Sequence, residues 1–96
     1  MSKMSKVILE GHIIVPDADI LTVKAELDNH IKLTRAEAGC LVFKVTQDSN
    51  NNSRFKVYEE FVDRDSFANH QVRAGESKWA FVTKNVVRHY KITDVE

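Results

Sequence analysis

Residues 40–62 read CLVFKVTQDSNNNSRFKVYEEFV, in which two apolar runs are separated by a short polar segment. The runs 40–47 and 54–62 are rich in β-branched and aromatic residues, a composition typical of strands. Residues 48–53, DSNNNS, have the composition of a turn. Because a short polar turn joins the two strands, this stretch predicts an antiparallel hairpin.

The segments before the hairpin predict a strand and a helix. Residues 7–15, VILEGHIIV, form a β-branched run that stops at Pro16, as a strand would. Asp17 and Asp19 are candidate N-caps for a helix that runs to about Glu37 and ends at Gly39. Its apolar residues recur at steps of three and four: Ile20, Val23, Leu27 and Ile31.

The segments after the hairpin repeat this alternation. Asp63 can cap a second helix over residues 64–74, which Gly75 interrupts, and Ser77 can cap a further helical segment. Residues 88–93, RHYKIT, predict a last strand. The order β-α-β-β-α-β predicts an α+β, ferredoxin-like fold, one antiparallel sheet with its helices on one face. We expect a single domain over residues 7–93, with residues 1–6 and 94–96 as tails.

The composition excludes several classes of protein. The chain has 96 residues, with 14 Lys+Arg against 14 Asp+Glu. This balance argues against a nucleic-acid partner, because proteins that bind nucleic acids usually carry an excess of Lys and Arg. No apolar run approaches the roughly 20 residues of a membrane span. Residues 1–6 lack the apolar core of a signal peptide, so the expected compartment is the cytoplasm.

No motif in the sequence points to a cofactor or a metal. A phosphate loop, a dinucleotide fingerprint, a nucleophile elbow and a zinc-protease helix are all missing from the sequence. Cys40 is the single cysteine and follows a predicted helix C-terminus, whose negative end would raise the pKa of the thiol. We therefore expect no cofactor, no metal and no reactive thiolate.

The predicted sheet has apolar residues on both faces, although helices would cover only one. The residues left facing water would include Ile8, Ile14, Tyr58 and either Val42 or Phe43. An exposed apolar sheet face is a candidate subunit interface. We therefore expect a homodimer formed through this face.

Two residues are the first candidates for chemistry. Glu59 alternates with Phe55, Val57 and Phe61 on an otherwise apolar strand face, where a carboxyl group would have a raised pKa. His70 lies three residues after Phe67, so it would point between the helices and the sheet. The alternative is structural: His70 is a hydrogen-bonded, half-buried residue and Glu59 an ion-pair partner.

Other polar and aromatic residues have structural interpretations beside functional ones. His30 lies at the edge of the apolar stripe of the first helix, and His12 lies in the polar centre of the first strand, so both can be structural. Trp79 is a candidate pocket wall, and Tyr58 belongs to either the pocket or the interface.

The sequence resembles the antibiotic biosynthesis monooxygenase (ABM) domain family over nearly its whole length. The resemblance is carried by the turn 37–43, EAGCLVF, by the run 52–63, NSRFKVYEEFVD, and by the approach to His70 from Ser66 and Phe67. The central stretch is most similar to the branch that processes phosphorylated autoinducer-2, and Asn29-His30 resembles the position of a helix-one histidine in that branch.

The resemblance implies a dimeric α/β barrel with a pocket between sheet and helices in each subunit. It implies catalytic roles for His70, Glu59 and His30 and a cofactor-independent monooxygenase acting on a quinol or polyketide-like small molecule. The implied substrate contacts are His12, Phe43, Tyr58, Phe61 and Trp79. The alternative within the family is an isomerase of a phosphorylated hydroxyketone, and both reactions begin with proton abstraction next to a carbonyl.

A third hypothesis is a domain that binds a small metabolite without catalysis, since a fold does not fix a function. The lining of the pocket discriminates among the three. A polar cavity with Glu59, His70, His30 and His12 favours isomerisation of a small ketone. An apolar slot walled by Trp79 and phenylalanines favours a planar aromatic substrate, and a filled cavity favours the non-enzymatic hypothesis.

Overall fold

The computed structural model describes residues 5–95, and the first part of the expected N-terminal tail, residues 1–4, lies outside them together with Glu96. The predicted element order is confirmed. In chain order the elements are β1 (Lys6–Ile14), the 3₁₀ turn η1 (Asp17–Asp19), α1 (Ile20–Arg35), β2 (Cys40–Asp48), β3 (Asn51–Phe61), α2 (Arg64–Gly75), α3 (Lys78–Val82) and β4 (Val87–Val95).

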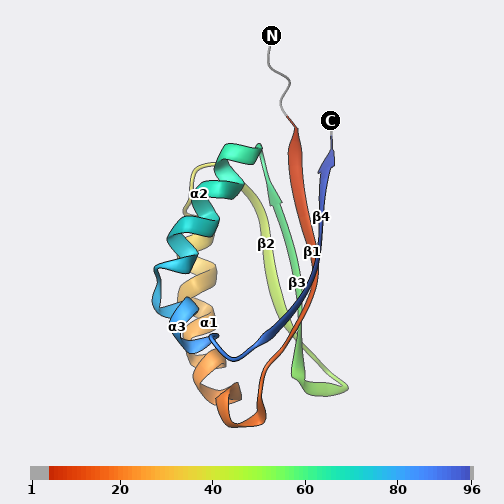
Figure 1. The fold of residues 1–96 in the computed structure, drawn as a ribbon, viewed down its shortest axis with the longest axis vertical. Coiled ribbons are helices and arrows are strands. Elements are labelled where there is room, and N and C mark those ends of the chain that lie inside the picture. Colours follow the sequence, from red (N-terminus) through yellow and green to blue (C-terminus); the bar gives the residue numbers. More distant parts are fainter. Residues whose placement is uncertain (1–4, 96) are drawn as a thin grey trace.

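The strands form one antiparallel sheet in the order β2-β3-β1-β4, and the helices lie together on one face of it (Figure 1). This is the predicted ferredoxin-like α+β architecture. Alternate residues of the two central strands point toward the helices, among them Leu9 and Ile13 of β1 and Phe55 and Phe61 of β3. Burying these side chains against α1 and α2 is the main favourable contribution to folding.

The turns that place the helices agree in part with prediction. The carboxylate of Asp63 accepts a hydrogen bond from the Ser66 backbone N–H at 2.8 Å, so it caps α2 as expected. Gly39 has φ +88°, and a Cβ there would collide with the Ser66 side chain, so this turn requires glycine. Asp19 does not cap α1 with its side chain, because the 3₁₀ turn η1 leads directly into the helix.

The second face of the sheet carries no helix, as Figure 1 shows. Tyr58, Ile8, Ile14 and Val42 lie on this open face, whereas Phe43 is buried on the helix side. The register decides between Val42 and Phe43, since Phe43 pairs with the buried Glu59 and Val42 with Glu60. In the described part of the chain, the helices are all too short or too polar to cross a membrane.

Candidate functional site

A pocket of about 320 Å³ opens between the sheet and the helices. Its lining comes from β1, β3 and β4 on the sheet side and from all three α-helices on the other. The apolar part of the lining consists of Leu9, Trp79 and small residues of α2 and α3. The polar part consists of His30, Glu59, His70, Gln71, Arg88 and Tyr90.

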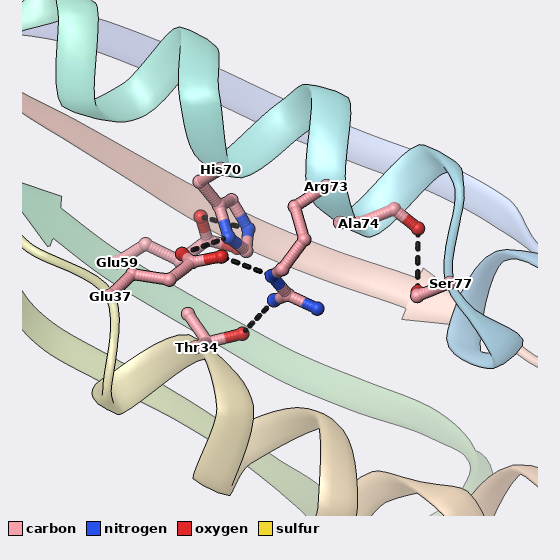
Figure 2. A network of polar contacts seen from close by, with 7 residues as sticks. All are labelled: Thr34, Glu37, Glu59, His70, Arg73, Ala74 and Ser77. Carbon is pink, nitrogen blue, oxygen red and sulfur yellow. Dashed lines mark hydrogen bonds and ion pairs between the residues drawn. The ribbon is translucent and has the colours of Figure 1, made fainter.

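His70 of α2 is buried and is held by a partly buried polar network, drawn in Figure 2. Its Nδ1 lies 2.8 Å from Glu37 Oε1, in the turn after α1. The other oxygen of Glu37 accepts a hydrogen bond from Arg73, whose guanidinium also donates to Thr34 Oγ1 at 3.0 Å. Since Glu37 already accepts from a cation, it acts as an acceptor toward His70 as well, and the Nδ1–H of His70 donates.

Glu59 approaches His70 from the sheet. Its Oε1 lies 3.9 Å from His70 Nε2, on the side of the ring opposite Glu37. The residue is 6% exposed, and in the described structure this oxygen has no hydrogen-bond partner. Burial, and then the negative charge of Glu37, raise the pKa of Glu59 to about 7. Glu59 can therefore exchange a proton near neutral pH.

His30 of α1 completes the inner wall of the pocket. Its ring stacks on Trp79 with centroids 4.6 Å apart and planes 7° apart, and it lies 6.0 Å from the ring of His70. Burial lowers the pKa of His30 to about 3, with smaller contributions from His70 and Arg73, so the ring is neutral. Its buried Nδ1 has no partner among the described residues. An unpaired buried nitrogen beside a pocket is available to a ligand.

Two predicted substrate contacts lie behind His70 instead of in the pocket lining. The ring centroids of Phe61 and Phe43 are 5.0 and 5.7 Å from that of His70. Both phenylalanines are buried in the core, and neither lines the pocket. They pack against the imidazole and so contribute to its burial, and burial lowers the pKa of His70.

The structure does not bring His12 and Tyr58 to this pocket, which corrects the lining predicted for them. Both lie on the open face, because side chains alternate between faces along a strand. His12 stacks on His89 with centroids 4.7 Å apart, and the Tyr58 hydroxyl donates to Glu60 at 2.5 Å. They are the two members of the predicted site that the tertiary structure separates from Glu59, His70, His30 and Trp79.

Sequence reasoning did not assign a role to Glu37, Arg88 or Tyr90. The EAGC turn is the one sequence motif that marks Glu37. Arg88 and Tyr90 reach the pocket because β4 pairs with β1, which no local pattern reveals. Cys40 has a raised thiol pKa, as predicted, but burial and the charges of Glu37 and Glu59 are the causes.

The family model of the antibiotic biosynthesis monooxygenases matches residues 9–79. The chain belongs to this family. The match includes His30, Glu37, Glu59 and His70, so the partly buried polar network lies within the ABM domain. No protein with a curated description matches the chain in sequence.

Solved structures share the ABM fold of this chain. A Deinococcus radiodurans protein, provisionally named an antibiotic biosynthesis monooxygenase, is 25% identical at a TM-score of 0.75, covering 94% of this chain and 90% of its own. A Bacteroides thetaiotaomicron protein with the same provisional name is 20% identical at 0.76, covering 96% and 88%. A conserved protein of unknown function from the latter organism is 13% identical at 0.80, covering 94% and 97%.

Proposed function

We propose that this ABM protein is an enzyme that removes a proton from the carbon next to the carbonyl of a small, polar hydroxyketone. One observation carries the proposal: a carboxyl group with a pKa of about 7 and an unpaired oxygen shares a pocket with a histidine oriented by a second carboxylate. Enolisation needs one group that removes the proton from carbon and a second group that donates a proton to the carbonyl oxygen.

His70 is the base in this proposal. Its Nδ1–H donates to Glu37, so the neutral ring presents the lone pair of Nε2 toward Glu59 and the pocket. Burial lowers the pKa of His70 although Glu37 opposes this, so the ring is neutral and able to accept a proton near pH 7. The imidazolium formed when Nε2 takes the proton is stabilised by the Glu37 carboxylate.

Glu59 is the acid. As Nε2 takes the C–H proton, the electron pair moves toward the carbonyl, and protonated Glu59 donates its proton to the carbonyl oxygen. The enediol then has two fates. In isomerisation, Glu59 takes a proton from the neighbouring hydroxyl and His70 returns its proton to the former carbonyl carbon. In oxygenation, which requires a carbon that carried two hydrogens, dioxygen is the oxidant and adds to the deprotonated carbon while Glu59 takes back the enol proton. The peroxide takes the proton held by His70, and loss of water from this hydroperoxide leaves a new carbonyl group that contains one oxygen atom of dioxygen.

The polar lining favours isomerisation. The pocket is at the lower end of the range of ligand sites and presents six polar side chains, a poor fit to a large planar polyketide. Oxygenation is the second candidate, because the family and the D. radiodurans relative carry the name monooxygenase and because the stacked Trp79 and His30 offer a flat wall.

The test follows proton exchange in deuterated water by NMR, with dihydroxyacetone and phosphorylated dihydroxypentanedione as probes, beside oxygen uptake on quinols. Exchange or isomerisation without oxygen uptake is expected. Oxygen uptake without added cofactor would establish the second candidate. Failure of all three reactions, with binding retained, would favour the non-enzymatic hypothesis.

We also propose that two copies associate through the open face. Support comes from its uncovered apolar residues, Ile8, Ile14, Val42 and Tyr58. Light scattering is expected to give a dimer that Ile8→Lys converts to monomer. Leu21→Lys, at a site 81% exposed on α1, is the matched control. A monomeric wild-type chain would contradict this assembly.

A further inference from the structure

We propose that Arg88 and Tyr90 form an oxyanion subsite at the pocket and that the substrate carries a carboxylate or phosphate group bound there. The proposal deepens the proposed function by naming the class of substrate. It concerns two β4 residues that belong to no part of the acid–base network described above. They line the same pocket as Glu59, His30 and His70.

Strand pairing brings both side chains to the pocket. Arg88 pairs with Ile13 and Tyr90 with Gly11, so both lie on the helix side of the sheet. The backbone of β4 approaches Gly11 so closely that a Cβ at Gly11 would collide with the carbonyl of His89, the residue between Arg88 and Tyr90. Gly11 therefore allows β4 to lie where its side chains reach the pocket.

The guanidinium of Arg88 is held in place and not neutralised. Its Nη2 donates to Thr83 Oγ1 at 2.9 Å, and that hydroxyl donates in turn to the Trp79 carbonyl at 2.6 Å. Thr83 is fully buried, so it is a fixed anchor. Among residues 5–95, no carboxylate lies within ion-pairing distance of Arg88. An ordinary surface arginine would lack this buried anchor.

Tyr90 supplies a second donor. Tyr90 is 38% exposed, and the partial burial of its ring raises the pKa of the phenol, an effect that the nearby charge of Arg88 opposes and does not cancel. The hydroxyl is therefore protonated at neutral pH. A guanidinium and a phenol beside one cavity suit a carboxylate or phosphate, which accepts several charge-assisted hydrogen bonds.

The rest of the pocket gives such a substrate its orientation. Two buried atoms without partners, His30 Nδ1 and Glu59 Oε1, mark the inner end as the place for hydroxyl and carbonyl groups. The charged end is then left to Arg88, since Arg73, the other arginine near the network, is occupied by Glu37 and Thr34. A ligand with a charged end and a hydroxyketone end satisfies both sets of groups.

The experiment compares three small hydroxyketones by titration calorimetry: dihydroxyacetone phosphate, hydroxypyruvate and uncharged dihydroxyacetone. In the wild type we expect at least one anion to bind about tenfold or more tightly than dihydroxyacetone, since charge-assisted pairs are the strong ones. Arg88→Gln is expected to abolish that preference, and Arg88→Lys to retain part of it. Tighter binding of dihydroxyacetone phosphate would indicate a phosphate substrate, and tighter binding of hydroxypyruvate would indicate a carboxylate substrate.

Arg64→Gln is the matched control, because Arg64 is an exposed α2 arginine paired with Asp94 outside the pocket. It is expected to keep the preference. NMR shifts in the wild type are expected to change at Arg88 and Tyr90 when the anion is added, which covers the case of a variant that does not fold. Equal affinity for all three compounds, no binding, or shifts elsewhere would overturn the proposal. Binding needs no turnover, so an inactive enzyme that still prefers the anion would contradict the proposed function alone.

Discussion

Glu59 and Glu60 are neighbours on β3, yet the two faces of the sheet give them opposite properties. Glu59 points under the helices, and burial raises its pKa to about 7. Glu60 points to the open face, where hydrogen bonds from Tyr58 and Lys6 lower its pKa. A glutamate side chain is thus a proton donor on the covered face and an anion on the open face, and burial is the cause of this difference.

The histidines repeat this contrast. His30 and His70 lie on the covered side of the sheet, buried and 6.0 Å apart, one with an unpaired nitrogen and the other oriented by Glu37. His12 and His89 stack on the open face without a carboxylate partner among the described residues. The comparison predicts that substitutions of titratable residues on the covered face reduce activity and that the same substitutions on the open face do not.

The largest expected effect comes from His70→Ala. Loss of the base should lower kcat/KM by about 10²- to 10⁴-fold, the usual contribution of a positioned acid or base. His12→Ala is the control on the open face and should leave the rate within about twofold, measured as deuterium exchange into the substrate. Equal losses in both variants would remove the functional distinction between the faces.

Glu37→Gln tests whether the orienting carboxylate matters. The variant still accepts a hydrogen bond but offers no charge to the imidazolium, so kcat should fall about 10- to 100-fold, with little change in KM. Because Glu37 raises the pKa of His70, the acid limb of the pH profile should move to lower pH. An unchanged profile would show that Glu37 has a structural role only.

Glu59→Gln should change both activity and stability. The wild-type kcat/KM is expected to fall as pH rises through about 7, because Glu59 loses its proton there. The variant should lack this alkaline limb, and its kcat should be about tenfold lower than that of the wild type.

The stability effect of Glu59→Gln has a definite sign. A folded pKa raised from 4.5 to about 7 means that wild-type stability falls as pH rises between those values. Glutamine does not ionise, so the free energy of unfolding of the variant, measured in urea, should rise by about 3 kcal/mol relative to wild type between pH 4 and pH 8. A constant difference across this range would contradict the buried, titrating Glu59.

Glu60→Gln is the matched change on the open face and should have the smallest effect. Its partners Tyr58 and Lys6 are partly exposed, so the loss of stability should stay below about 1 kcal/mol. Because Glu60 has a lowered pKa, any loss should be present at neutral pH and vanish in acid. Deuterium exchange should keep its wild-type pH profile.

The sequence by itself determined the elements, their order and the two-sided character of the sheet. Alternation along 54–62 places Glu59 among core residues, and helical spacing places His70 beside Phe67, because both periodicities are local consequences of backbone geometry. The ABM family followed from motifs within single segments. Strand alternation alone separates Tyr58 from its neighbour Glu59, whereas the β1–β3 register is needed to place His12 on the face opposite Glu59.

Only the tertiary structure decided what surrounds Glu59 and His70. Glu37 reaches His70 from a turn 33 residues earlier in the chain, and Arg73 of α2 binds Glu37 and Thr34 across 36 and 39 residues. Arg88 and Tyr90 enter the pocket because β4 pairs with β1, at the opposite end of the sequence. Such contacts depend on how helices and strands pack, and a pKa depends on burial and nearby charge, so neither is encoded in a local pattern.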